Sequence, residues 1–307
     1  MNSALTLRFS TQAQLDIRRI TRELSDLQRQ VASGVKANDL RGFGGAASRL
    51  LNAQSLRSDA DSRVSVIDQL QARFGVQGAA LGQVAQSSSL LSQSIREAIS
   101  SNDGRGIAVE LSMTFSSIVS ALNETWNGQP MFAGERQNGG PVKIASLDAL
   151  AAAPIPSGVF DEAERHQIIE LGAGEPVILS NKASELSSGL FQTLKDMKLF
   201  LDAAGGTIGQ PITGPQRDAL QAFADQLDAE ANKFTNEEGR AGQLQARFTS
   251  ERVRLQERSN LLLKEIGEQA DADVASISVQ LNSLLVQYQA AAKTFSDLSK
   301  LSLLNYL

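Results

Sequence analysis

The position of the prolines is the feature that most limits how this chain can fold. All seven lie between Pro130 and Pro215, so residues 1–129 and 216–307 contain none. Because proline removes a backbone donor and clashes with the preceding turn, a long stretch without it can form uninterrupted helices. We therefore expect long helices at both ends of the chain and a different kind of structure between them.

The N-terminal stretch carries apolar residues at helical spacing, in alternating steps of three and four that place them on one side of a helix. The set is Ile17, Ile20, Leu24, Leu27 and Val31. Gly34 then offers a helix stop. After a glycine-rich loop, a second stripe runs from Ile67 to Ala98 and is broken at 102–104, and a further helix is expected from about Ile107 to Trp126.

The C-terminal stretch has the most regular pattern of the chain, because its apolar residues alternate steps of four and three as in a coiled coil. The set is Ala270, Val274, Ile277, Leu281, Leu284, Tyr288, Ala291, Phe295 and Leu298. We expect one helix from Ile266 to Leu304, which at about 1.5 Å per residue would be roughly 60 Å long and would need a partner. Upstream, a similar stripe from Leu220 has a soft break at Gly239 and Gly242.

The C-terminal helix is poor in charge. From Val274 to Leu307 the only charged residues are Lys293, Asp297 and Lys300. A helix whose outer face meets water normally carries more charge, so other protein is expected to cover this helix on most sides. The alternative is a tail helix docked on the core of its own domain. Because isolated helices depend on packing, we expect both arms to be largely unfolded or fluctuating in the monomer and to become ordered on assembly.

The middle of the chain has a different composition. It holds all the prolines and half of the glycines, and short apolar runs at 142–144, 166–171 and 176–179 are typical of strands between turns. We interpret residues 128–186 as an inserted, partly β subdomain.

These patterns predict a mainly α fold, a long antiparallel helical bundle or coiled coil built from both termini with a small inserted β-containing subdomain. We expect an N-terminal arm of one helix and a turn at 1–45 and the first part of a helical core at 46–127. The insertion at 128–186 follows, then the second part of the core at 187–265 and a C-terminal helical arm at 266–307. Aromatic residues make up only 5% of the chain, which favours a core of Leu, Ile, Val and Ala.

The composition argues against several kinds of partner and several cellular locations. The net charge of -5 offers no basic field for nucleic acid. No stretch approaches the roughly 18 apolar residues of a membrane span, and the first ten residues lack the charged and apolar regions of a secretory leader. The chain has no cysteine, which removes disulfides and thiolate sites. We expect a soluble protein that is either cytosolic or exported without a cleaved leader.

The residues of catalytic sites are also scarce. The single histidine, His166, falls in an expected strand and is better explained as a surface or hydrogen-bonded structural residue. Gly42–Gly45 could in principle cradle a phosphate, but it lacks the lysine and preceding strand of such loops, so we interpret it as a flexible turn. We predict that the chain is not an enzyme and holds no cofactor and no metal.

Short motifs lie at the ends of the expected segments. Ala32–Asn38 follows the first helix, Asp271–Ala275 opens the last helix, and Ile95–Ala98 lies in the second. They are similar to the S-S-G-x-[RK]-[IV]-N turn, the D-x-D-x-A segment and the R-E-L stretch of the flagellin superfamily of bacterial flagellar axial proteins. The chain therefore resembles this superfamily at both ends, although Leu40–Gly45 departs from the acidic pair that usually follows the first turn.

Within the superfamily, two further motifs are more similar to the hook-associated protein 3, or hook-filament junction, family than to flagellin. Asn127–Gly134 resembles its G-x-[YP]-[LI]-F-[AG]-G motif, and Leu301–Leu307 resembles its S-L-L-[ND]-[YF]-L ending. Ser180–Leu201 is similar to that family's return from the insertion into a helix. The single positions that carry the match are Ser33, Gly34, Asn38, Phe132, Gly134, Asp271, Asp273, Asn305, Tyr306 and Leu307.

The resemblance implies a structural role in a ring of subunits between the hook-side hook-associated protein and flagellin. The two apolar stripes would form the assembly interface. It also implies secretion to the flagellum by type III export without a cleaved signal peptide, a cytosolic export chaperone that holds the C-terminal arm, and no cofactor. Two alternatives stay open: a flagellin that forms the filament itself, and a cytosolic coiled-coil tether or adaptor.

Overall fold

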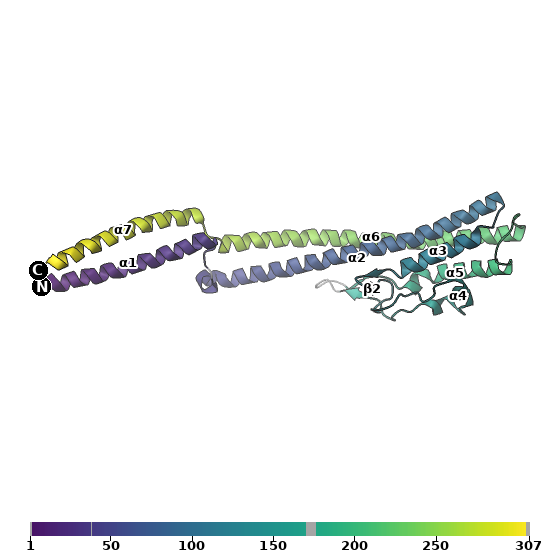
Figure 1. Cartoon of the computed structure of the whole chain (residues 1–307), viewed down its shortest axis with the longest axis horizontal. Coiled ribbons are helices and arrows are strands. Elements are labelled where there is room, and N and C mark those ends of the chain that lie inside the picture. The colour runs from purple at the N-terminus through teal and green to yellow at the C-terminus, as the bar shows by residue number, and fades with distance from the viewer. Residues whose placement is uncertain (1, 38, 170–175, 305–307) are drawn as a thin grey trace. The chain divides into compact units, whose positions relative to one another are not determined.

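The structure is a computed structural model that describes residues 2–37, 39–169 and 176–304, without the side chains of 2–10, 156–157 and 298–304. Within these ranges it is mainly α, which confirms the predicted fold class (Figure 1). The long helices are α1 (Asn2–Ser33), α2 (Ala47–Ser101), α3 (Ile107–Leu122), α5 (Ala183–Ala203), α6 (Gly214–Ala270) and α7 (Val274–Leu304).

The shorter elements lie between these helices. A 3-10 helix, η1 (Leu40–Ala46), precedes α2, and α4 (Leu147–Ala152) and a second 3-10 helix, η2 (Pro156–Val159), lie in the insertion. Four two-residue strands form two antiparallel pairs. They are β1 (Thr125–Trp126) with β2 (Gln129–Pro130), and β3 (Ile168–Ile169) with β4 (Val177–Ile178).

The chain forms two compact units. One combines Met1–Ser62 with Leu255–Leu307, and the other is Arg63–Arg254. In the second unit α2 and α6 run antiparallel, because Arg96 of α2 bonds Asp225 of α6 whereas Asp68, earlier in α2, bonds Arg252, later in α6. Helices α3 and α5 lie beside them (Figure 1).

The core of the second unit joins the helices to the insertion. Three phenylalanines are almost completely buried: Phe115 of α3, Phe191 of α5, and Phe132, which follows β2. The ring of Phe191 lies 5.9 Å from that of Phe115 and 5.2 Å from that of Phe160, which comes from the insertion. The insertion therefore packs its apolar side chains into the same core as the helices.

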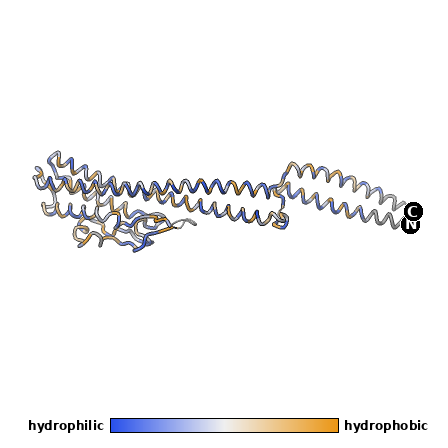
Figure 2. Tube along the Cα trace, turned by 180° about the vertical axis from the view of Figure 1, so that it is seen from behind, coloured by the Kyte–Doolittle hydropathy of each residue, from blue (hydrophilic) through white to orange (hydrophobic). Residues whose placement is uncertain are grey.

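Hydropathy along the helices changes over short distances. Figure 2 shows polar and apolar segments alternating along the trace, and none of the helices in the described ranges is long and apolar enough to cross a membrane.

Several local expectations are wrong in detail. One helix from Ile266 to Leu304 is not formed, because α6 ends at Ala270 and α7 begins at Val274. No break occurs at Gly239 or Gly242, since tertiary packing outweighs the roughly 1 kcal/mol cost of a glycine in a helix.

The middle of the chain also differs from expectation. Helix α3 ends at Leu122, and Trp126 lies in β1 instead. Of the expected strand at 142–144 only a bridge between Val142 and Phe160 forms, and β3 and β4 are shorter than predicted. Residues 170 and 171 of the expected strand at 166–171 lie outside the described residues.

Candidate assembly interface

The two apolar stripes of the arms meet in the first unit. Helix α1 packs along α7 (Figure 1). Ile20, Leu24 and Ile277 are buried, at 4%, 9% and 7% exposure. Ile17, Leu27, Leu281, Leu284, Ala291 and Phe295 are half-buried, and Val31, Val274 and Tyr288 are exposed. The side chain of Leu298 lies outside the described residues.

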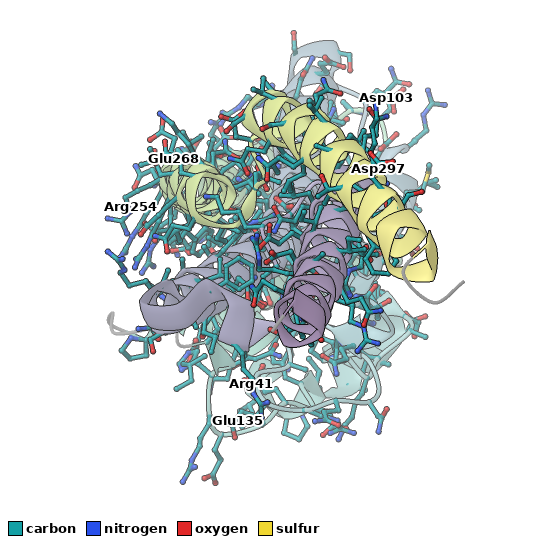
Figure 3. The ribbon with its side chains drawn as sticks, turned by 90° about the vertical axis from the view of Figure 1, so that its left-hand side faces the viewer. Arg41, Asp103, Glu135, Arg254, Glu268 and Asp297 are labelled. Carbon is teal, nitrogen blue, oxygen red and sulfur yellow. The ribbon has the colours of Figure 1, made fainter. Side chains whose placement is uncertain are left out.

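The outer face of α7 keeps apolar side chains exposed. Val279 is 70% exposed, Val286 is 66% and Leu285 is 38%. The sequence interpretation did not include these residues, although the seven-residue step from Val279 to Val286 places both on one face of the helix. Charged side chains such as Asp297, labelled in the end-on view of Figure 3, are few on this helix. Scattered single apolar residues are normal on a surface, but here they lie within residues 274–292, which contain no charged residue.

The motifs at the two ends of the arms are brought together, although more than two hundred residues separate them in sequence. Val35 forms a β-bridge with Asp271. The Lys36 backbone N–H donates to the Ala270 carbonyl at 2.8 Å, and the Ala272 N–H donates to the Gly34 carbonyl at 2.9 Å. Gly34 has φ +73, a conformation that favours glycine, and it ends α1. The two family-like motifs therefore form one short ladder, which we call the arm bridge (residues 34–36 with 270–272).

Charged side chains stabilise the helix ends at the arm bridge. The Lys36 ammonium group donates to the carbonyl oxygens of Glu268 and Gln269 at 2.8 and 3.0 Å, which places a cation at the C-terminus of α6. Asp273 accepts from the Ser276 N–H at 3.1 Å and caps the start of α7. This cap and the arm bridge explain why the long C-terminal pattern is divided into two helices.

The other motif positions have different surroundings. Ser33 accepts a weak hydrogen bond from the Val35 N–H at 3.4 Å. Asp39 caps η1 by accepting from the Gly42 N–H at 2.9 Å, so the loop expected to be a flexible turn is a short 3-10 helix. Asn38, Asn305, Tyr306 and Leu307 lie outside the described residues.

The motif that opens the insertion is part of the core. Phe132 is fully buried, and its carbonyl accepts from the Ala183 N–H at 2.8 Å, while the Ser180 hydroxyl donates to the Met131 carbonyl. Gly134 has φ +64, and a Cβ there would lie 2.3 Å from the Arg165 carbonyl oxygen. The motif thus ties the start of the insertion to its return at 180–183.

His166 has a structural contact. Its Nε2 lies 2.7 Å from a carboxylate oxygen of Glu185, near the start of α5. Burial raises the pKa of Glu185, but hydrogen bonds from His166 and from the backbone and side chain of Lys182 outweigh burial and hold that pKa below its usual value. In the ranges that the structure describes, no three His, Asp or Glu side chains are placed to hold a metal ion.

Comparisons with known proteins agree with this arrangement. Residues 224–307, which include most of α6 and the C-terminal arm, match the model of the bacterial flagellin C-terminal helical region. A search of curated proteins found no match.

Two solved structures are similar to the chain. One is a candidate flagellar hook-associated protein from Vibrio parahaemolyticus, with a TM-score of 0.59, 16% identity, and coverage of 73% of this chain and 97% of that chain. The other is FlgL from Bacillus cereus, with a TM-score of 0.47, 16% identity, and coverage of 68% and 98%. The likeness to the Vibrio protein shows a shared fold. The match shows that residues 224–307 form a C-terminal helical region of the bacterial flagellin type.

Proposed function

We propose that this chain is a structural subunit of the bacterial flagellum that assembles through its terminal helices, and that its place is the hook-filament junction. One observation carries the proposal: α1 and α7 pair through their stripes, yet α7 keeps Val279, Leu285 and Val286 exposed within residues 274–292, which contain no charged residue. A second layer of helices from neighbouring subunits would cover this face.

The junction assignment has two supports. The C-terminal region is of the flagellin type, as expected of a subunit that contacts flagellin. The fold is shared with a protein whose name is hook-associated. The expected contacts are then with flagellin on one side, with the hook-side hook-associated protein on the other, and with copies of this chain in a ring.

The assembly role needs the stripes predicted from sequence, from Ile17 to Val31 on α1 and from Val274 to Leu298 on α7. We further propose that the chain is exported by the flagellar type III route, and that a cytosolic chaperone holds the C-terminal arm until export. This role is structural, and neither a catalytic group nor a cofactor takes part in it.

The experiment that tests the junction role is deletion of the gene in the source bacterium. Cells without the protein are expected to keep their hooks and to release unpolymerised flagellin into the medium. Electron microscopy of the cells and immunoblots of the medium would measure both. Normal filaments on the deleted cells would overturn the junction assignment.

A filament-forming flagellin is the second candidate, favoured by the match of residues 224–307 to the flagellin C-terminal region. Seeded assembly separates the two roles. A flagellin extends seeds into long filaments, whereas a junction protein is expected to add only a few layers. The other alternative, a cytosolic coiled-coil tether, would stay inside the cell. Sheared cell-surface material probed for this chain tests that alternative, because a tether would be absent from it.

A further inference from the structure

Two asparagines of this chain are each followed by glycine, in Asn127–Gly128 and Asn138–Gly139. Glycine has no side chain to shield its backbone nitrogen. That nitrogen can therefore attack the carboxamide carbon of the preceding asparagine when the backbone allows the two atoms to meet. Both asparagines are exposed to solvent, so accessibility does not distinguish them.

The backbone around Asn138 lies against a fixed cation. The Nε of Arg136 donates to the Asn138 carbonyl oxygen at 2.8 Å. A Cβ on Gly139 would lie 3.6 Å from a terminal nitrogen of the same guanidinium. The peptide bond between Asn138 and Gly139 is therefore polarised through its carbonyl oxygen. A hydrogen bond from a charged donor is stronger than one from a neutral donor.

The position of Arg136 is itself held by the insertion. Its guanidinium forms an ion pair with Asp161, whose other carboxylate oxygen lies 3.1 Å from the Lys143 ammonium group. The Asp161 N–H donates to the Pro141 carbonyl at 2.7 Å. The cation is thus oriented before any reaction begins.

We propose that Asn138 is a site of spontaneous deamidation that Arg136 promotes. The Gly139 nitrogen loses its proton to water and attacks the Asn138 carboxamide carbon. The carboxamide nitrogen takes a proton from water, its bond to that carbon breaks, and ammonia leaves to give a five-membered succinimide. Water then opens this ring at one of its two carbonyls and gives aspartate or isoaspartate. Negative charge on the attacking nitrogen is delocalised onto the Asn138 carbonyl oxygen, where the Arg136 guanidinium stabilises it.

Asn127 provides an internal control. It has φ +50 and occupies the first turn position of the hairpin between β1 and β2, where Trp126 pairs with Gln129. Such a tight turn fixes both central residues in left-handed conformations. Its backbone cannot rotate freely toward the geometry of attack, so its amide is expected to persist while Asn138 reacts.

The product changes the charge of this loop. A new carboxylate at residue 138 lies next to Arg136 and competes with Asp161 for the same guanidinium. Isoaspartate would also lengthen the backbone between Arg136 and Gly140. This modification is independent of the flagellar role proposed above.

The test is to incubate the intact purified chain at neutral to mildly alkaline pH and to follow both asparagines by peptide mass spectrometry. In the folded chain the peptide with Asn138 is expected to gain the mass of an acid, with isoaspartate fragments, while the Asn127 peptide lags. In urea both should react at similar rates. Equal rates in the folded chain would overturn the proposal.

Two variants separate the guanidinium from the fold of the loop. Arg136→Met is expected to slow modification of Asn138 by about tenfold, the factor that goes with about 1.4 kcal/mol of lost transition-state stabilisation. Asp161→Asn removes the ion pair but keeps Arg136, and Asn138 should still react faster than Asn127. An Arg136→Met chain that reacts as fast as the unchanged protein would contradict the role of Arg136.

Discussion

Single residues in the insertion show how similar motif positions differ in their constraints. Gly128 and Gly134 both lie in the segment that leaves the helices, and both have positive φ, at +78 and +64. Beyond its conformation, Gly134 is also in close approach to the backbone of Arg165, whereas nothing lies within 4 Å of a Cβ on Gly128. A side chain would have a conformational cost at both positions, but it would clash with neighbouring backbone only at Gly134.

Gly134→Ala should therefore destabilise the fold more than Gly128→Ala. Both pay about 1–2 kcal/mol for a left-handed alanine. Gly134→Ala adds about 1–3 kcal/mol because the carbonyl of Arg165 must move. Urea unfolding of the two variants measures the difference. Equal losses would show that the carbonyl moves without cost.

Acid should weaken the contact of Glu185 with His166 and Lys182. The pKa of Glu185 is lowered in the folded chain, so the unfolded chain binds more protons at acidic pH. The stability that this carboxylate adds is complete above its ordinary pKa and is lost as pH falls through the lowered one. Above the ordinary pKa of Glu185, the Glu185→Gln variant should have a lower free energy of unfolding than the unchanged protein. Urea unfolding at decreasing pH should show this difference shrinking. A disadvantage that does not change with pH would contradict the prediction.

Among the elements, α7 has the two faces that decide the proposed role. Leu284 is half-buried in the stripe, and Val279 is 70% exposed on the outer face. The same substitution at the two positions thus tests the pairing of the arms and the covering of the arms separately.

Leu284→Asp is expected to break the arm pair, because burying a carboxylate without a partner costs on the order of 1–3 kcal/mol or more. Assembly should fail, while circular dichroism and urea unfolding should show that the middle of the chain stays folded. Val279→Asp should change monomer stability by no more than about 0.5 kcal/mol, and yet it should stop assembly. Seeded polymerisation measures the assembly of both variants, and urea unfolding measures their stability. Normal assembly of Val279→Asp would argue that the outer face stays open.

The elements that follow from local pattern could be predicted from sequence. The sequence predicts helices in the regions of α1, α2 and α7 because their apolar residues repeat at helical spacing over many turns. The division of the C-terminal pattern at 271–273 could not be found this way, because it depends on pairing with residues 34–36, far away in sequence. Likewise, periodicity identifies the stripe with Leu284, but only the packing shows which apolar residues, such as Val279, are left outside.

At the scale of the whole molecule, the two units differ in how they are stabilised. The core of Arg63–Arg254 combines several helices with the insertion, and Phe115, Phe132 and Phe191 lie deep within it. The arms are a pair of helices, and an isolated pair buries little apolar surface.

Limited proteolysis of the purified monomer should therefore remove the arms first and leave a fragment close to 46–265. Cleavage follows the population of locally opened states, which is larger where fewer apolar contacts must break. Mass spectrometry of the fragments over time identifies the order of cleavage. Arms that resist as long as the middle would contradict both this prediction and the expectation that they order on assembly.

The arm bridge also has a consequence for the evolution of length. It joins residues 34–36 to 270–272, so everything between them is a closed loop of chain. The entropy of closing such a loop grows only with the logarithm of its length, about 0.6 kcal/mol for each doubling. A lineage could therefore enlarge or trim the middle of the chain many times over while the same few backbone hydrogen bonds kept the two termini in register.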